Sequence, residues 1–310
     1  MAGPSASATV LVPASLAERV NAILGQPVRY ATAAVGGHSN FVFIVGDAVI
    51  KAASAPIKRA DVAREIQLLR AIDGLGCSAP TLIGSSVDDE WSVLATIKSA
   101  GTPGPVNLGQ LLFDPSSAAA FGTLMGRLLR TVHGCAPHPA PGALFERTGL
   151  LADAAQRLRA LEISSRTRDA LEESIANPVH AQGVAFLHGD PGLHNVMLDI
   201  ESDQVGTRLR IAALIDWELG GWGNALSDVS WLYWTLWFRG LVAHAWPSFV
   251  DTYGPWALRA LGWAPNNVRT CVLGQMAVLL VRTDASTAVR DVWLERIGSL
   301  ETMEIWELAQ

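Results

Sequence analysis

The chain has 310 residues, of which 50% are hydrophobic and 17% charged. This composition excludes an intrinsically disordered chain, and the length is sufficient for one large domain or for two lobes with a real core. The formal net charge of -6 argues against a protein that binds nucleic acid by neutralising its phosphates. We therefore expect a folded protein that does not act on nucleic acid.

The charge is unevenly distributed along the chain. Residues 1–100 contain 8 basic and 8 acidic residues, whereas residues 101–310 contain the remaining 15 basic and 21 acidic residues. An acidic half favours a cationic ligand through long-range attraction. A surface with excess carboxylates gives the same pattern, and on charge alone that simpler interpretation is preferred.

The cysteines and the apolar runs indicate the cellular location of the protein. Cys77, Cys135 and Cys271 are far apart, which fits neither a disulfide framework nor a zinc site, and each is expected to be a small buried hydrophobic residue. The N-terminus lacks the pattern of a signal peptide. Apolar runs such as Trp231–Phe238 are too short to span a membrane. We expect a cytoplasmic protein that does not insert into membranes.

The first hundred residues predict short strands with two helices. Residues 1–12 show no pattern and are expected to be irregular. Helical spacing is present in Leu16–Leu24, which ends at Gly25, and in Arg59–Ile72, which ends at Gly74. Strands are expected at Val28–Tyr30, Phe41–Val45, Ala48–Lys51, Pro80–Gly84 and Trp91–Ile97, with turns at Gly36-Gly37 and Gly46-Asp47.

The rest of the chain is predicted to be mainly helical. Residues 98–106 contain two Gly and two Pro and are interpreted as a linker. Helices are expected at Ser117–His133, Ala152–Leu161 and Thr167–Ile175, a strand at Gly183–Leu187, a hairpin from Val196–Leu198 and Leu209–Ile215, and further helices from Ser227 onward. The sequence therefore predicts an α+β fold with two lobes, a small β-rich N-lobe (1–98) and a larger α-helical C-lobe (99–310), with the hinge near 95–106.

The strongest chemical signal is the segment His188-Gly189-Asp190-Pro191-Gly192-Leu193-His194-Asn195. It lies between two apolar runs, which favours a loop held between buried elements. Phosphoryl transfer to an alcohol needs a carboxylate near the hydroxyl and an oxygen ligand for Mg²⁺. Asp190 and Asn195 supply these two groups from one loop. A turn made of ordinary turn-forming residues is the simpler alternative.

A second acidic motif follows at Leu214-Ile215-Asp216-Trp217-Glu218. A carboxylate at the end of an apolar strand is costly to bury unless a cation lies beside it. Mg²⁺ bound to nucleotide phosphates would be that cation, because hard metals prefer oxygen ligands. Alternatively, Asp216 caps the turn at Gly220-Gly221. Together with the loop around Asp190, the metal-binding interpretation is favoured.

The N-terminal half carries candidate residues for the nucleotide. Gly36, Gly37, Ser39 and Asn40 lie in a turn between two strands, where backbone N–H groups can approach phosphate oxygens. Lys51 lies on the next strand, and Glu65 on the following helix could pair with it. Neither a P-loop nor a dinucleotide-binding glycine motif is present.

The residues quoted above resemble the aminoglycoside phosphotransferase family, which has the two-lobed protein-kinase-like fold. The resemblance runs from about Gly36 to Trp237, and its most specific parts are HGDPGLHNVMLD and LIDWELGGWGNALSDVSWL. The second part is similar to hygromycin-phosphotransferase-like members. The resemblance implies a small-molecule kinase that uses ATP or GTP with Mg²⁺.

The resemblance also implies roles for individual residues. Asp190 takes the catalytic role, with His188 as a brace of its loop, and Asn195 and Asp216 take the metal-ligand roles. Lys51 and Glu65 match the lysine–glutamate pair, Asp228 ties the catalytic loop to the C-lobe, and His133 is structural. The backbone of Ala95, Thr96 and Ile97 is the implied contact for adenine.

Two departures from the family pattern are visible. Members commonly carry His two residues after the catalytic Asp and Gly just before the Asn, whereas this chain has Gly192 and His194 there. The common acidic residue of the hinge is replaced near Ile97-Lys98, so the choice between ATP and GTP stays open. Neither departure affects Asp190, Asn195 or Asp216.

The acceptor is the part that the sequence specifies least. Trp217 and Trp222 flank Asp216 and could line a substrate site, whereas Trp231 and Trp234 have the helical spacing of core residues. Candidate acids for a cationic acceptor include Glu218, Asp284 and Asp291. An aminoglycoside-type antibiotic is the preferred acceptor, and an amino sugar or amino alcohol of metabolism is the alternative. A kinase-like binding module without activity is disfavoured because the catalytic residues are present. The oligomeric state is left open.

Overall fold

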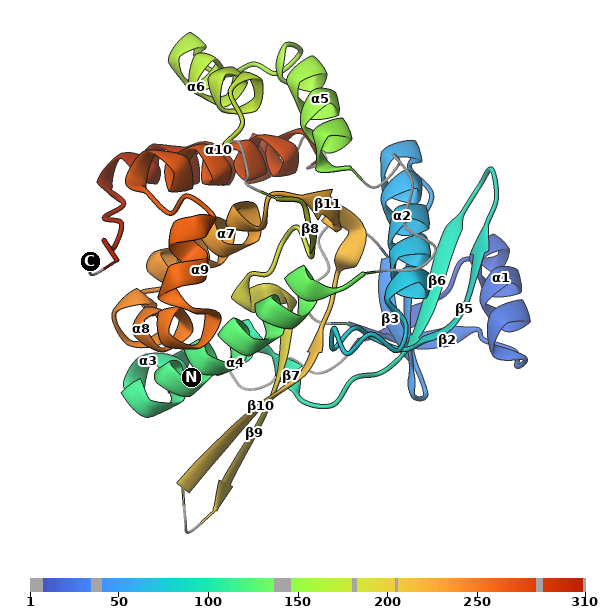
Figure 1. The fold of residues 1–310 in the computed structure, drawn as a ribbon. Coiled ribbons are helices and arrows are strands. Elements are labelled where there is room, and N and C mark those ends of the chain that lie inside the picture. Colours follow the sequence, from blue (N-terminus) through green and yellow to red (C-terminus); the bar gives the residue numbers. More distant parts are fainter. Residues whose placement is uncertain are drawn as a thin grey trace. The chain divides into compact units, whose positions relative to one another are not determined.

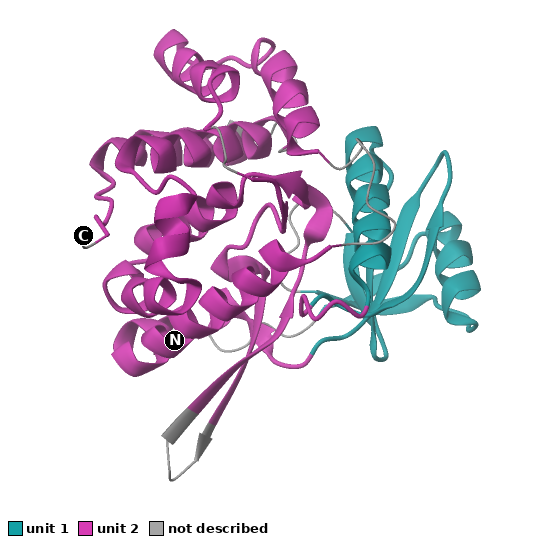
Figure 2. Cartoon of the chain, viewed as in Figure 1, with its two compact units in different colours: residues 1–73, 79–99 teal, residues 74–78, 100–310 magenta. Residues whose placement is uncertain are grey.

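The computed structural model describes residues 8–34, 41–136, 146–179, 183–203, 206–282 and 287–308. The chain forms two compact units (Figure 2): the first contains Met1–Asp73 and Ala79–Ser99, the second Gly74–Ser78 and Ala100–Gln310. An antiparallel sheet is followed by a mainly helical region, which confirms the predicted α+β fold. That the two units divide nucleotide binding and acceptor binding between them stays a prediction.

The first unit is built on a six-stranded sheet (Figure 1). Its order is β1 (Thr9–Leu11), β2 (Tyr30–Ala33), β3 (Phe41–Val45), β4 (Ala48–Ala53), β6 (Ser92–Ile97) and β5 (Leu82–Val87), and each neighbouring pair is antiparallel. Two helices accompany the sheet, α1 (Ala14–Leu24) and α2 (Pro56–Ile72).

The irregular start predicted for residues 1–12 is wrong at β1. Thr9 to Leu11 pair with β2, with Thr9 opposite Thr32. The predicted strand at Val28–Tyr30 also begins later, at Tyr30. Three residues are too few to show an alternating pattern, so backbone pairing with a neighbour decides that β1 is a strand.

Helix α1 covers an apolar part of the sheet. Leu16 and Val20 lie one turn apart on its buried face, and they belong to one cluster with Ile50 of β4 and Val93 of β6. Gly25 then ends the helix in the left-handed conformation with φ of 67°, which glycine adopts without steric cost.

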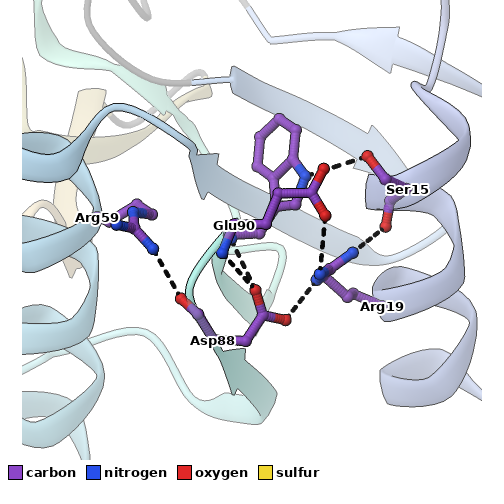
Figure 3. A network of polar contacts seen from close by, with 6 residues as sticks. Ser15, Arg19, Arg59, Asp88 and Glu90 are labelled. Carbon is purple, nitrogen blue, oxygen red and sulfur yellow. Dashed lines mark hydrogen bonds and ion pairs between the residues drawn. The ribbon is translucent and has the colours of Figure 1, made fainter.

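A polar network joins the turn after β5 to both helices of the first unit (Figure 3). Arg19 of α1 donates to the Asp88 carboxylate at 2.6 Å and to Glu90 at 3.1 Å, and Arg59 of α2 donates to the Asp88 carbonyl at 2.9 Å. The carboxylate of Asp88 also accepts the backbone N–H of Trp91 at 2.8 Å. The hydrogen bond from Arg19 lowers the pKa of Asp88 well below its usual range. The network therefore sets the connection into β6.

The second unit is mainly helical. Its helices are α3 (Leu108–Phe113), α4 (Pro115–Gly134), α5 (Arg147–Leu158), α6 (Ser165–Ala176), α7 (Ala225–Phe238), α8 (Val242–Tyr253), α9 (Pro255–Ala260), α10 (Pro265–Arg282) and α11 (Thr287–Ser299). Its strands are β7 (Thr102–Pro103), β8 (Ala185–Leu187), β9 (Val196–Asp203), β10 (Gly206–Leu214) and β11 (Gly221–Gly223). Strands β9 and β10 form the long ribbon that projects at the bottom of Figure 1.

The linker predicted at 98–106 is largely structured. It contains β7, which pairs with β9, and the 3-10 helix η1 (Gly104–Asn107). A Cβ at Gly101 would lie 2.3 Å from the carbonyl oxygen of Leu198, and one at Gly104 would lie 2.3 Å from that of Leu193. These glycines are therefore needed for close backbone contact rather than for flexibility.

Tight helix packing forms much of the second core. A Cβ at Gly122 of α4 would lie 1.9 Å from the carbonyl oxygen of Ala245 of α8, so the two helices meet backbone to backbone. Helix α7 is buried on nearly every side, and Trp231, Tyr233 and Leu232 are each 1% exposed or less. No helix in the described part of the chain is long and apolar enough to cross a bilayer.

Two of the three cysteines meet in the second unit. The Sγ atoms of Cys77 and Cys135 lie 2.7 Å apart, although 58 residues separate them in sequence. Burial, together with the neighbouring Cys135 thiol, raises the pKa of Cys77. Cys77 is buried as expected, whereas Cys135 is only half-buried. The contact between the two thiols was not predicted, because the fold and not the spacing brings them together.

Candidate active site

The loop of residues 188–195 connects β8 to β9 and depends on one glycine. Gly189 has φ of +88°, and a Cβ there would lie 2.1 Å from the carbonyl oxygen of Leu219. Both the positive φ and this close approach exclude a side chain at position 189. The glycine between His188 and Asp190 is thus a steric requirement of the loop.

Asp228 in the first turn of α7 holds the start of this loop. Its Oδ2 accepts the N–H of His188 at 2.8 Å, and its Oδ1 accepts the N–H of Gly189 at 2.9 Å. Burial would raise the pKa of Asp228, but the hydrogen bond from His133 and the charges of His133 and Arg147 outweigh burial and lower that pKa. Arg147 also donates to the carbonyl of Gly189 at 3.2 Å. The loop-tying contact predicted for Asp228 is present.

His188 is fully buried and bonded through both ring nitrogens. Its Nε2 lies 2.9 Å from the carbonyl oxygen of Ile215, and its Nδ1 accepts the N–H of Asp190 at 3.2 Å. Only a neutral ring protonated on Nε2 satisfies both bonds. Burial lowers the pKa of His188, which favours the same neutral form. The ring lies too deep to reach a substrate, so His188 is a brace that positions Asp190 and not itself a catalytic group.

The carboxylate of Asp190 is held from two sides. Trp231 Nε1 donates to Oδ1 at 2.5 Å, and His194 Nε2 lies 3.0 Å from Oδ2. Asp190 is 8% exposed. Because each carboxylate oxygen can accept more than one hydrogen bond, an arriving hydroxyl can still donate to it.

His194 takes the space that a side chain at position 192 would need. A Cβ at Gly192 would lie 2.5 Å from Cε1 of His194. The residues at positions 192 and 194 are therefore sterically linked in this chain, because the ring of His194 lies beside Gly192. Burial would lower the pKa of His194, but the charge and the hydrogen bond of Asp190 outweigh burial and raise it.

The two predicted metal ligands lie on neighbouring segments. Asn195 is 4% exposed, and its Nδ2 donates to the Asp190 carbonyl at 2.9 Å, so its side-chain oxygen is the atom available to a cation. The N–H of Ile215 donates to the Asn195 carbonyl at 2.8 Å, which brings the adjacent Asp216 to the same region.

Asp216 itself has an unusual backbone. Its φ of 67° and ψ of 63° are left-handed, a conformation that costs a residue other than glycine about 1–2 kcal/mol. Such strain persists where the surroundings hold a side chain in a required place. An amide oxygen and a half-buried carboxylate form an oxygen donor set of the type that Mg²⁺ takes.

The residues predicted to line an acceptor site differ in how far they are buried. Trp217 is fully buried, with its Nε1 donating to the Leu214 carbonyl at 2.7 Å, so the prediction that it lines a substrate site is wrong. Trp222 is half-buried and packs edge-on against Phe186 at 5.5 Å. The remaining candidates are Glu218, which is half-buried beside Trp217, Asp291, which is exposed on α11, and Asp284, which lies outside the described residues.

In the first unit, Lys51 and Glu65 form the predicted ion pair. Lys51 Nζ of β4 lies 2.7 Å from Glu65 Oε2 of α2, and the two side chains are 11% and 4% exposed. The phosphate turn predicted at Gly36, Gly37, Ser39 and Asn40 lies outside the described residues. Of the residues predicted to bind the nucleotide phosphates, the structure therefore describes Lys51 and Glu65 but not the turn.

The predicted adenine contact needs correction at Ala95 and Thr96. Both residues lie in β6, which pairs with β4 on one side and β5 on the other. The N–H of Ile97 donates to the Thr81 carbonyl at 2.9 Å. Because sheet pairing uses the backbone groups of Ala95 and Thr96, these two residues are not free to bind a base. Ile97, which is 49% exposed at the strand end, stays a prediction.

Three residues around Asp190 were not predicted as site residues. Trp231 was assigned to the core by its spacing, His194 was noted only as a departure, and Arg147 was not singled out. The aromatic run after Asp216 could have drawn attention to Trp231, because Trp231 lies on the helix whose first turn contains Asp228. Arg147 carries no signal in the sequence, since its role depends on how α5 packs.

Comparison with known proteins finds one matching family. The model of the phosphotransferase enzyme family matches residues 31–264. None of the curated proteins compared with the chain matches it.

Solved structures of aminoglycoside phosphotransferases have the same fold. A thermostable mutant of APH(4)-Ia in ternary complex with ADP and hygromycin B is 13% identical, with 92% of this chain and 97% of that one covered and a TM-score of 0.63. The type VIII aminoglycoside-3'-phosphotransferase is 18% identical, with 81% and 91% covered and a TM-score of 0.58. APH(3'')-Id from Streptomyces rimosus with ADP and streptomycin is 19% identical, with 76% and 89% covered and a TM-score of 0.56.

Proposed function

The chain belongs to the phosphotransferase enzyme family, and from this premise we propose that it transfers the γ-phosphate of ATP or GTP to a hydroxyl of a small molecule. The observation that carries the proposal is the loop of residues 188–195. Buried hydrogen bonds hold the loop and with it the Asp190 carboxylate, which is 8% exposed, and Asn195 and Asp216 lie on the neighbouring segments.

Asp190 is the proposed contact of the acceptor. Its carboxylate accepts a hydrogen bond from the acceptor hydroxyl and so orients the oxygen toward the γ-phosphorus. A bond forms between that oxygen and phosphorus while the bond from phosphorus to the β,γ-bridging oxygen breaks. The hydroxyl proton passes to Asp190, and the products are the phosphorylated acceptor and a nucleoside diphosphate.

The other residues hold the phosphate donor. Asn195 and Asp216 would bind Mg²⁺, which neutralises charge on the phosphates when it is bound. Lys51, fixed by Glu65, would bind the α- and β-phosphates. Nucleotides bound to the solved relatives, ADP in two of them, support a nucleotide donor.

Aminoglycosides are the first acceptor class to test. Hygromycin B and streptomycin are bound in the solved relatives, which supports an aminoglycoside-type acceptor and a resistance function. An amino sugar or amino alcohol of metabolism is the second class. At 13–19% identity the relatives share the fold, and the choice of acceptor depends on the side chains around Asp190 in this chain.

A transfer assay tests the proposal. The full chain is incubated with Mg²⁺, ATP or GTP and each acceptor, and the products are analysed by mass spectrometry for one added phosphoryl group. Asp190→Asn is expected to lower kcat by orders of magnitude with nucleotide affinity nearly unchanged, since Asp190 contacts the hydroxyl. The control is Asp199→Asn, a surface residue paired with Arg210. Full activity of Asp190→Asn would contradict the assignment.

A further inference from the structure

The peptide group between Gly189 and Asp190 leads directly into the proposed catalytic carboxylate, and both of its polar atoms are bonded to side chains. The carbonyl oxygen of Gly189 accepts a hydrogen bond from Nη1 of Arg147 at 3.2 Å. The N–H of Asp190 donates to Nδ1 of His188 at 3.2 Å. Asp228 accepts the N–H groups of His188 and Gly189, which belong to the two preceding peptide groups. Arg147 therefore holds the carbonyl side of the one peptide group that Asp228 does not reach.

This peptide group needs a hold because it follows a glycine. Gly189 has φ of +88°, and glycine allows a wider range of backbone rotation than any other residue. Rotation of the peptide plane after Gly189 would turn the side chain of Asp190 away from its position. Misplacement of a reacting group by about 1 Å slows an enzymatic step by about 100-fold. A side chain that fixes this peptide plane therefore affects the chemistry at Asp190.

Arg147 reaches the loop from the first residue of α5. Helix α5 lies beside β11 and α10 (Figure 1). The stem of Arg147 passes β11 at Gly223, where a Cβ would lie 3.2 Å from Cδ of Arg147. A cation in the first turn of a helix is unfavourable because it opposes the helix dipole. The stability of α5 therefore does not explain an arginine at this position, whereas its contact with the loop does.

The guanidinium group of Arg147 is buried and bonded to neutral oxygens. Arg147 is 7% exposed, and the acceptors that the structure describes for it are the Gly189 carbonyl and Oε1 of Gln275. Burial lowers the pKa of Arg147 and outweighs the charges of Asp228 and Asp190, which act in the opposite direction. A buried charge is costly unless opposite charges and hydrogen bonds stabilise it. Here two carboxylates act at a distance, and the hydrogen bonds go to the loop and to Gln275.

Gln275 of α10 holds the guanidinium group from its other side. Its Oε1 accepts from Nη2 of Arg147 at 2.5 Å, and the residue is 1% exposed. Its Nε2 is buried and has no hydrogen-bond partner within the residues that the structure describes. Because an unpaired buried donor lowers stability, the acceptor oxygen is the group that explains a glutamine at this position. Arg147 and Gln275 together thus support the Gly189 carbonyl.

We propose that Arg147, held by Gln275, is a positioning residue that fixes the Gly189–Asp190 peptide group and so directs the Asp190 carboxylate toward the acceptor hydroxyl. This inference rests on the proposed transfer of phosphate at Asp190 and adds α5 and α10 to the elements that position it. Asp228 fixes the backbone before Gly189, and Arg147 fixes the backbone after it. Arg147 acts through the backbone and not on the nucleotide, so its loss should lower kcat and leave KM for the nucleotide nearly unchanged.

Steady-state kinetics of the full chain tests the role of Arg147. Arg147→Met is expected to lower kcat by about 100-fold, and Arg147→Lys, which keeps the charge but not the planar fork, by about tenfold, with KM for the nucleotide changed by less than about twofold. Leu158→Ala is the matched control, since Leu158 is fully buried in the same helix about three turns away. Well below the Tm of every variant, it should keep kcat. Unchanged kcat in Arg147→Lys, or an equal fall in Leu158→Ala, would overturn the inference.

Substitutions of Gln275 separate hydrogen bonding from packing. Gln275→Glu keeps an acceptor oxygen for Arg147 and is expected to keep kcat within about threefold of wild type. Gln275→Leu fills a similar space without an acceptor and is expected to lower kcat by about tenfold. A lower kcat in Gln275→Glu than in Gln275→Leu would contradict the role assigned to the acceptor oxygen.

Amide hydrogen exchange, followed by NMR on the full chain, tests the positioning without turnover. The ratio of the exchange rate of the Asp190 amide to that of the Gly189 amide cancels changes in global stability, because Asp228 holds the Gly189 amide directly. This ratio is expected to rise by about tenfold in Arg147→Met and to stay unchanged in Leu158→Ala. Arg147→Lys gives the same comparison where Arg147→Met does not fold. An unchanged ratio in the Arg147 variants would overturn the inference.

Failure of this inference and failure of the proposed function give different results. If the ratio rises and Asp190→Asn keeps full activity, Arg147 positions the loop and the chemistry assigned to Asp190 is wrong. If Asp190→Asn is inactive and the ratio is unchanged, the assignment of Asp190 holds and the positioning by Arg147 is wrong.

Discussion

Asp228 receives the backbone N–H of His188 on one carboxylate oxygen and uses the other for Gly189. A side chain in α7 thereby sets the backbone of a loop 40 residues earlier in the chain. The position of Asp190 therefore depends on α7 as well as on its own loop. Substitution of either Asp228 or Gly189 should therefore affect both stability and transfer activity.

Replacing Asp228 by Asn is expected to lower the free energy of unfolding by about 3 kcal/mol. The amide can accept only one of the two N–H groups, and its own NH₂ then faces the other. Chemical denaturation measures the change, and transfer activity should fall with it. Asp153→Asn removes a half-exposed carboxylate paired with Arg157 and is expected to change stability by less than about 0.5 kcal/mol.

The same substitution has a pH signature. The folded-state pKa of Asp228 is lowered, so its contribution is fully present above the unfolded pKa of about 3.9 and is lost as pH falls toward the folded value. The stability difference between wild type and Asp228→Asn should therefore shrink below about pH 4. A difference that grows on acidification contradicts the assignment of Asp228 as a buried carboxylate.

Gly189→Ala is expected to destabilise the protein by more than about 2 kcal/mol and to abolish transfer. Its Cβ would enter the space of the Leu219 carbonyl in a backbone conformation with positive φ. Gly149→Ala is a matched control of opposite sign, because Gly149 lies inside α5 with no atom within 4 Å of the new Cβ. Removal of a helical glycine should stabilise by about 0.5–1 kcal/mol. Thermal unfolding of the two variants should thus move in opposite directions.

The sequence could predict the elements that have a strong local pattern. The helix expected at Ser117–His133 is α4, Pro115–Gly134, because its apolar residues recur on one face. The hairpin around residues 196–215 was predicted too short, since β9 and β10 extend into polar residues that only the pairing holds in strands. The three-residue β1 was missed for the same reason.

The catalytic segment was more predictable than its surroundings. Asp190, Asn195 and Asp216 are read directly from two contiguous motifs, and the Lys51–Glu65 pair from the order of strand and helix. Trp217 was wrongly expected at a substrate site, whereas Trp231 is a core residue as expected. Its spacing along the helix did not show that its ring also contacts the loop of Asp190. Tertiary packing decides that Trp217 fills the core while Trp231 bonds to Asp190.

The ion pair in the first unit should show energetic coupling. Lys51 and Glu65 are largely shielded from water, so a double-mutant cycle with Lys51→Met and Glu65→Gln is expected to give about 1–3 kcal/mol. Both variants should also raise KM for the nucleotide, since an unfixed lysine binds phosphates less well. The exposed pair Arg166–Glu301 is the reference and should give no more than about 1 kcal/mol. Equal coupling in the two cycles would show that shielding plays no part.

Cys77 and Cys135 are expected to form a disulfide when the protein is treated with a peroxide. Their Sγ atoms are 2.7 Å apart, so a small movement is enough to form the S–S bond, with two thiols oxidised and the peroxide reduced to water. The cross-link would close a loop of 58 residues and stabilise the protein by about 2–4 kcal/mol. Peptide mapping without reduction should identify Cys77 joined to Cys135, while Cys271 stays open to alkylation after unfolding. Cys135→Ser should remove both the cross-link and the oxidant-dependent rise in Tm; a rise that persists in this variant would assign the effect to another site.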